Sequence, residues 1–206
     1  SACDEAVFFF FSDAVHKYYN GAWSAAQPLD SKWNLFVPIR RANRFLVEVD
    51  QQSYEDYLWD KDPTYETLMT EVERFKMEAR ALRAYYYFEL AKRYGDVPLI
   101  TTLLTEEEAN QLSRTTFQEV IEFIVQDCDS VAPHLPKNYA DERLGETGRI
   151  TQGAAMAIKA RALLYAASPL HNPDNDVAAW QEAAEASISI IDSGLYSLSP
   201  SYSSVF

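Results

Sequence analysis

Residues 78–100 read EARALRAYYYFELAKRYGDVPLI, and they place four aromatic residues in a row, at 85–88, inside a charged helical pattern that stops at Gly95. Successive side chains of an α-helix are turned by about 100° around its axis, so a single apolar face cannot absorb four of them. We therefore expect this helix to be covered on more than one side.

Composition places the chain among globular proteins and disfavours several classes of partner. Of its 206 residues, 48% are hydrophobic, and 18 Lys and Arg stand against 31 Asp and Glu, which gives a net charge of −13. Such a charge repels phosphate backbones, so no nucleic acid is expected as a partner. The two cysteines and three histidines show no metal-binding spacing, and neither a metal site nor a cofactor is expected.

Apolar periodicity and capping residues predict an all-α protein. Residues 1–29 form an aromatic-rich, irregular start, and residues 195–206 begin a following region. The expected helices cover residues 30–49 (bent or delayed by Pro38), 62–95, 116–131, 151–167 and 176–193. We group residues 1–206 as a single helical-repeat domain, with the repeats at 30–194.

Two apolar stripes are expected on the helix at 62–95. The first comprises Leu68, Val72, Phe75, Ala79, Leu82 and Tyr86, and the second comprises Ala81, Tyr85, Phe88 and Ala91. We expect Tyr86 in the core, so that truncating it to Ala would cost roughly 3–5 kcal/mol. In the helix at 116–131, Cys128 lies on the apolar stripe and is interpreted as a core thiol.

A repeated tetrapeptide points to stacked helix pairs. Ala-Arg-Ala-Leu occurs at residues 79–82 and again at 160–163, in the middle of a predicted helix each time. The offset of 81 residues equals two helix pairs of about 40 residues, which is typical of helical repeats. Stacked antiparallel pairs bury the inner helices on two sides, as the aromatic run requires.

Several blocks of the sequence occur in the same order in a known family of proteins. The most specific block is EARALRAYYYF at 78–88 followed by YGDVPL at 94–99. All the blocks, in order, are residues 4–6, 20–24, 33–46, 78–88, 94–99, 148–165, 180–184, 194–198 and 205–206. With these blocks the chain resembles the helical N-terminal part of the SusD/RagB family of glycan-capturing surface lipoproteins. The resemblance implies a tetratricopeptide-repeat-like superhelix that forms part of a longer chain.

The resemblance also implies a location and a partner. Members bind oligosaccharide or polysaccharide at the outer membrane and close over a SusC-like TonB-dependent transporter. Ser1-Ala2-Cys3 is similar to the end of a lipobox, but no apolar segment precedes Cys3 and residues 4–6 resemble an internal segment. We therefore expect a surface-exposed protein whose lipid anchor is a Cys upstream of this chain.

No catalytic constellation emerges from the residues, so the protein is interpreted as a non-enzyme. Acidic clusters at 106–108, 127–129 and 174–176 are interpreted as solvated faces or helix caps, and His171 as a loop residue. Arg80 and Arg83 are expected to pair with acids of neighbouring helices. A glycosidase needs two carboxylates that face each other across the sugar, which sequence spacing does not reveal.

The candidate carbohydrate site lies in the aromatic-rich start of the chain. Aromatic rings pack on the C–H faces of sugars, while Asn and Asp bind their hydroxyl groups. Trp23 and Tyr19 are expected to stack on the sugar, and Asn20 and Asp4 to hydrogen-bond it. Trp33 and residues 8–11 are instead expected in the core.

Two other functions remain open at this point. A tetratricopeptide-like adaptor would bind protein through its concave surface and would show no affinity for sugar. An all-helical glycoside hydrolase would release reducing ends from a glycan.

Overall fold

The computed structural model describes residues 15–22, 24, 26, 28, 31–54, 64–139, 148–201 and 203, without the side chains of Tyr19 and Thr64. The chain divides into two compact units, Ser1–Asn34 and Leu35–Phe206. The expectation of one helical-repeat domain over residues 1–206 stays a prediction.

The first unit contains a short helix, α1 (His16–Asn20), which ends at Gly21 with φ of +67°. Glycine adopts this left-handed conformation without steric cost, and it commonly ends helices for that reason. Trp33, which we expected in the core, is 47% exposed. The expected core residues 8–11 lie outside the described residues.

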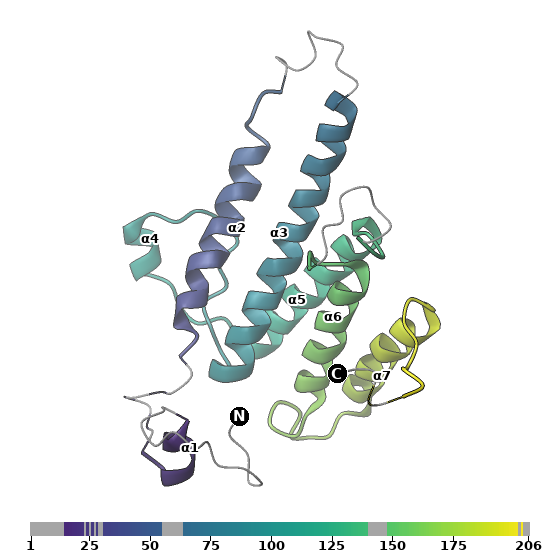
Figure 1. Ribbon diagram of the computed structural model, residues 1–206. Coiled ribbons are helices and arrows are strands. Elements are labelled where there is room, and N and C mark those ends of the chain that lie inside the picture. Colours follow the sequence, from purple (N-terminus) through teal and green to yellow (C-terminus); the bar gives the residue numbers. More distant parts are fainter. Residues whose placement is uncertain are drawn as a thin grey trace. The chain divides into compact units, whose positions relative to one another are not determined.

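The second unit consists of helices (Figure 1), and the prediction of an all-α fold is confirmed. Their bounds are α2 (Phe36–Val49), α3 (Thr64–Tyr94), α4 (Glu106–Asn110), α5 (Phe117–Val131), α6 (Gln152–Ala167) and α7 (Val177–Asp192), with the 3-10 turn η3 (Ala132–His134) after α5. A second 3-10 turn, η1 (Trp33–Leu35), includes the last residues of the first unit and the first residue of the second. The described residues contain no strand, and the backbones of Val97 and Thr115 form an isolated antiparallel bridge.

Local chemistry explains most helix ends. Thr116, Thr151 and Asp176 cap α5, α6 and α7 with their side chains. The residue that follows α3, Gly95, has φ of +66°, and its N–H donates to the carbonyl of Ala91 at 2.8 Å. The expected start of a helix near residue 30 is wrong, because η1 precedes α2. Pro38 then falls in the first turn of α2, where its missing N–H does no harm.

The long helices stack as antiparallel neighbours in the order α2, α3, α5, α6, α7 (Figure 1). Phe36 and Phe117 begin α2 and α5, so these helix starts show the same 81-residue offset as the two tetrapeptides. Ile39 and Val120 occupy equivalent positions at that offset, and both are buried. The predicted tetratricopeptide-repeat-like stacking of helix pairs is confirmed.

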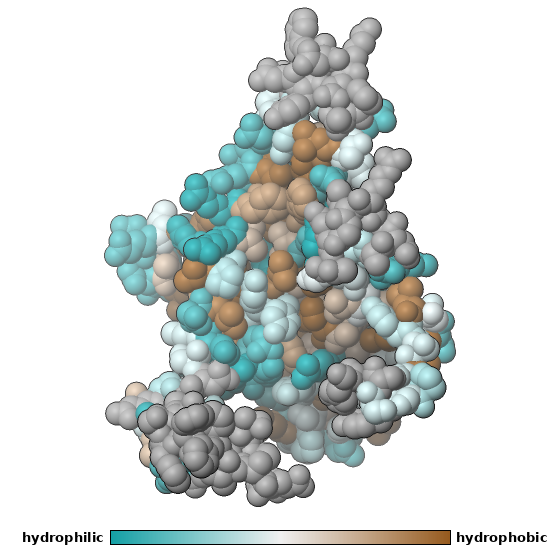
Figure 2. All heavy atoms as spheres, in the orientation of Figure 1, coloured by the Kyte–Doolittle hydropathy of each residue, from teal (hydrophilic) through white to brown (hydrophobic). Residues whose placement is uncertain are grey.

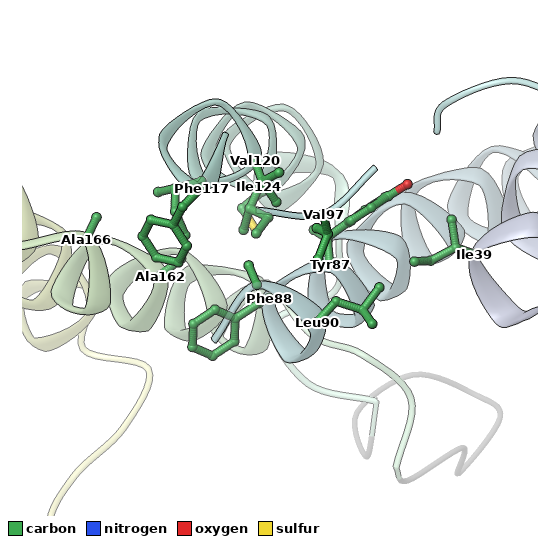
Figure 3. Close-up of a cluster of buried hydrophobic side chains, with 14 residues drawn as sticks. Ile39, Tyr87, Phe88, Leu90, Val97, Phe117, Val120, Ile124, Ala162 and Ala166 are labelled. Atoms are coloured by element: carbon green, nitrogen blue, oxygen red, sulfur yellow. The ribbon is translucent and has the colours of Figure 1, made fainter. Parts of the chain in front are cut away.

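The main core lies where α3 meets α5 and α6 (Figure 3). Tyr87 and Phe88 are 0% and 2% exposed, and their rings make edge contacts with Phe123 and Tyr165 at centroid distances of 5.5 and 5.3 Å. Two elements of the stack thus cover this part of α3, and the expectation of cover on more than one side is confirmed.

The predicted stripes of α3 are only partly right. Phe75, Leu82 and Tyr85 are 37–40% exposed, and Tyr86 is half-buried. Among the three consecutive tyrosines, the fully buried one is Tyr87, which both predicted stripes omitted. The helix rotates its buried face toward α5, whose position no periodicity within α3 can reveal. Tyr86 is therefore a poorer probe of the core than Tyr87.

Cys128 is a core thiol, as predicted. It is 1% exposed, and burial raises its pKa to about 12. A thiol with so high a pKa stays protonated and unreactive at neutral pH.

On the face shown in Figure 2, hydrophilic and hydrophobic side chains gather over different helices. Hydrophilic side chains cover α4, and hydrophobic ones are visible between α2 and α3. Helix α4 was not predicted as a helix, but its acidic residues at 106–108 are exposed, as expected, and Glu108 completes a capping box with Thr105.

Candidate functional site

The last residue of α1, Asn20, is the one predicted sugar-binding residue whose side chain the structure describes. It is exposed, and its Oδ1 accepts a hydrogen bond from the N–H of Ala22 at 3.0 Å. Asn20 therefore shapes the turn that leads to residue 23. Trp23, Asp4 and the side chain of Tyr19 lie outside the described residues, so the assembly of these four residues into one site stays a prediction.

A buried ionic cluster connects α2, α3 and α5. Asp127 on α5 is 4% exposed and accepts hydrogen bonds from both Arg80 (2.8 and 3.1 Å) and Arg83 (2.7 and 3.2 Å) on α3. Arg83 also donates to Oδ1 of Asn43 on α2 at 2.9 Å, and Asn43 donates to the carbonyl of Ile100 at 2.8 Å. The prediction that both arginines pair with acids of a neighbouring helix is confirmed.

Asp127 itself was misinterpreted as part of a solvated acidic face. It stands three residues after Ile124 and seven after Val120, on the buried stripe of α5. A carboxylate at a core position needs a cationic partner, and that spacing was the signal available in the sequence. The other acid of this pair, Asp129, is exposed and binds Lys159 at 2.6 Å.

A second cluster surrounds Glu78 on α3. Its carboxylate accepts hydrogen bonds from the Tyr139 hydroxyl and from Arg149, both at 2.6 Å. The Arg149 guanidinium also lies over the rings of Phe75 and Tyr139, at 4.9 and 5.1 Å. Burial and the hydrogen bond to Glu78 both raise the pKa of Tyr139. The cluster attaches the segments around residues 139 and 149 to α3.

A cavity of about 610 Å³ lies close by, between the first half of α3 and residues 133–136. Among its described lining residues, Glu73 is the single carboxylate, accompanied by Arg74 and His134. This lining therefore lacks the two facing carboxylates on which glycosidases rely. A polar hollow of this kind can accept a solute.

The other polar residues discussed from the sequence, His171 and residues 174–176, contact neighbouring parts of the fold. His171 lies in a loop, as expected, with its ring stacked on Phe117 at 3.5 Å. Burial lowers the pKa of His171, while the negative charge of Asp96 acts in the opposite direction. Asp176 caps α7, which confirms the interpretation of residues 174–176 as a cap. The part of the chain that the structure describes contains no group of three His, Cys, Asp or Glu side chains placed to hold a metal ion.

Within the described residues, no helix combines the length and the apolar character needed to cross a membrane.

Antiparallel helix pairs at an 81-residue offset, joined by a buried ionic cluster, define a tetratricopeptide-repeat-like scaffold. A family model described as "starch-binding associating with outer membrane" matches residues 8–164. The chain belongs to this SusD-like family.

Individual relatives agree with this assignment. SusD-like protein P25 of Formosa agariphila is 27% identical over 129 residues, which are 63% of this chain and 22% of the relative. A SusD-like protein from Bacteroides fragilis has a TM-score of 0.67 and 28% identity, with 90% of this chain and 33% of that chain covered. Surface glycan-binding protein A from Bacteroides uniformis has a TM-score of 0.65 and 26% identity, with 91% and 37% covered. The chain thus spans between a fifth and two fifths of the length of these relatives.

Proposed function

We propose that this chain is part of a non-enzymatic protein that binds oligosaccharide or polysaccharide at the cell surface and delivers it to a SusC-like TonB-dependent outer-membrane transporter. The observation that carries the proposal is the match of residues 8–164 to a family described as starch-binding and associated with the outer membrane. The likeness to a surface glycan-binding protein supports it.

The proposed sugar site comprises Trp23, Tyr19, Asn20 and Asp4. Asn20 and Gly21 form a tight turn shortly before residue 23 in the sequence, and this polar, glycine-containing segment supports the choice of Trp23 as a sugar-binding ring. In this proposal the rings of Trp23 and Tyr19 stack on the sugar, while Asn20 and Asp4 bind its hydroxyl groups.

The anchor and the chemistry form part of the same proposal. A lipidated Cys upstream of this chain holds the protein on the outer surface, and the helical repeats are the N-terminal portion of a longer protein. The bound glycan is passed on without hydrolysis. Release of reducing ends from a glycan incubated with the purified natural protein would contradict this point.

Calorimetry on the full natural protein tests the binding site. We expect Trp23→Ala to weaken binding of the cognate glycan by about 1 kcal/mol or more, because a stacking contact is lost, with an unchanged melting temperature. Tyr85→Ala is the matched control, since Tyr85 is an aromatic residue 40% exposed on α3 and outside the proposed site.

Three outcomes separate the alternatives. Unchanged affinity and melting in Trp23→Ala would place the sugar site elsewhere in the protein. A large drop in melting temperature would make Trp23 structural. Binding of peptides, together with no affinity for any glycan tested, would favour the adaptor over the proposed function.

A further inference from the structure

The end of α1 places an asparagine directly before a glycine. Asparagine occurs in the chain at residues 20, 34, 43, 110, 138, 172 and 175, and Asn20 alone is followed by glycine. Asn20 and Gly21 are both exposed, and Gly21 ends the helix with φ of +67°. In such a dipeptide the glycine nitrogen can attack the side-chain amide, because no side chain on the second residue hinders the approach. The reactivity of the pair then depends on how the turn holds the two groups.

The side-chain amide of Asn20 is polarised by the turn. Its Oδ1 accepts a hydrogen bond from the N–H of Ala22 at 3.0 Å. Negative charge develops on this oxygen when a nucleophile adds to Cγ, and a backbone N–H at hydrogen-bond distance stabilises such charge. The same hydrogen bond holds the amide beside the backbone of Gly21, which lies between the two bonded residues. The turn therefore favours addition to Cγ.

The backbone nitrogen of Gly21 is accessible. A Cβ built on Gly21 would meet no other residue within 4 Å, so water reaches this part of the backbone. Among the residues that the structure describes, none accepts a hydrogen bond from the Gly21 N–H, whereas the Gly95 N–H after α3 donates to Ala91. An amide N–H that makes no such bond loses its proton to solvent hydroxide more readily than a bonded one. Gly21 therefore supplies a nucleophile.

We propose that Asn20 is a site of spontaneous deamidation in the folded protein. Solvent hydroxide removes the proton from the Gly21 nitrogen, which attacks Cγ of Asn20 and forms a new N–C bond. The bond between Cγ and Nδ2 then breaks, and the leaving nitrogen takes a proton from water and departs as ammonia. Water opens the resulting succinimide ring at either of its carbonyls, which gives aspartate or isoaspartate. The net reaction consumes water and releases ammonia in equal amounts, and nothing is oxidised or reduced.

The products differ from asparagine in charge and in backbone length. A carboxylate replaces a neutral amide, on a chain whose net charge is already −13. Isoaspartate also inserts a methylene group into the main chain before Gly21, so the left-handed turn has to rearrange. If Asn20 binds sugar hydroxyl groups, as proposed above, modified molecules lose that geometry. The deamidation itself does not depend on sugar binding.

Asn110 is a matched control within the same chain. It is exposed and is the last residue of α4, a helix of five residues, as α1 is. The residue that follows is Gln111, whose side chain restricts the backbone and whose N–H donates to the carbonyl of Glu108 at 3.1 Å. Asn110 therefore shares the setting of Asn20 but lacks its nucleophile.

Peptide mass spectrometry of the full natural protein tests the proposal. The folded protein is incubated at neutral and at mildly alkaline pH beside a sample unfolded in urea, and the peptides that contain Asn20 and Asn110 are followed over time. Isoaspartate is measured separately by enzymatic methylation of its carboxylate. The variant Gly21→Ala is treated in the same way.

We expect Asn20 of the folded protein to deamidate at least about ten-fold faster than Asn110, with both products formed and with a rate that rises with pH. Gly21→Ala should slow the reaction at Asn20 at least about ten-fold, because the added methyl group hinders the attack. Equal rates at the two asparagines of the folded protein would overturn the proposal. Reaction of Asn20 in the unfolded sample alone would also overturn it, because the fold would then protect the dipeptide.

Discussion

Asp127 is the counter-ion of the two arginines, Arg80 and Arg83, that α3 directs toward α5. It accepts all four hydrogen bonds that Arg80 and Arg83 direct toward α5, and Arg83 is itself 7% exposed. We expect Asp127→Asn to lower the free energy of unfolding by roughly 3 kcal/mol, because it leaves a buried guanidinium without a counter-charge. Urea denaturation of the purified protein measures this change.

Asp129→Asn is the control for this prediction. Asp129 lies two residues away and also forms an ion pair, but its side chain is 55% exposed. We expect a loss below about 1 kcal/mol, as is usual for ion pairs at the surface. Similar losses for both variants would show that burial does not determine the value of the Asp127 cluster.

Tyr87 offers a second prediction, on pH dependence. Its hydroxyl donates to the carbonyl of Ile100 at 2.9 Å and accepts from the Ile100 N–H at 2.7 Å. Burial raises its pKa from the ordinary 10.0 to about 12. The folded state therefore retains the phenolic proton more tightly than the unfolded state, and stability that is present below pH 10 is lost as the pH rises toward about 12.

Removal of the hydroxyl tests both effects. We expect Tyr87→Phe to cost about 1–3 kcal/mol at neutral pH, because the N–H of Ile100 loses its partner while its carbonyl keeps the hydrogen bond from Asn43, and to flatten the loss of stability above pH ~10. Tyr85→Phe, at a 40% exposed ring, should alter neither quantity. Unfolding curves at several pH values measure the free energy of unfolding as a function of pH. If this free energy fell as steeply above pH ~10 in Tyr87→Phe as in the parent protein, the prediction would be contradicted.

At the level of elements, two capping boxes of the same design have different consequences. Thr116 caps α5, where its Oγ1 accepts from the N–H of Glu119 at 3.3 Å, and Thr105 caps α4 in the same way through Glu108. Seven residues of α5 are buried, whereas α4 has no buried residue. The contribution of a cap to global stability depends on whether the helix that it starts is part of the core.

We therefore expect Thr116→Ala to lower the free energy of unfolding by about 1 kcal/mol. Thr105→Ala should leave global unfolding almost unchanged, because α4 can fray while the core stays folded. Chemical denaturation of the two variants beside the parent protein measures the difference. Equal losses would show that α4 belongs to the same cooperative unit as α5.

The caps and the glycine stops were predictable from sequence because each depends on residues within one turn of the helix end, as at Thr116 and Gly95. The order of the helices along the chain followed from these predicted ends. The burial of Tyr87 and Asp127 was missed because it depends on how α3 faces α5, and no periodicity within one helix encodes that relation. Of the predicted sugar site, the structure describes only the side chain of Asn20, so the other three residues rest on sequence alone.

At the level of the whole molecule, the proposed function predicts a location and a partner that can be tested. If the proposed function holds, the natural protein should fractionate with outer membranes and co-purify with a large β-barrel transporter in mild detergent. An unrelated outer-membrane barrel from the same preparation serves as the control and should not be enriched. Recovery from the cytosol alone would contradict the prediction.

The cluster around Asp127 also limits how far the helix pairs are interchangeable. Repeat arrays often unfold pair by pair, since each unit contacts only its neighbours. Here Arg80 and Arg83 belong to the α2–α3 pair, whereas their counter-charge, Asp127, belongs to α5. Each helix pair on its own would therefore contain charges without their ion-pair partners. A chimera that joins the α2–α3 pair of this protein to the following pair of a relative would lose the stability of this cluster unless that relative also carries an acid at the position of Asp127.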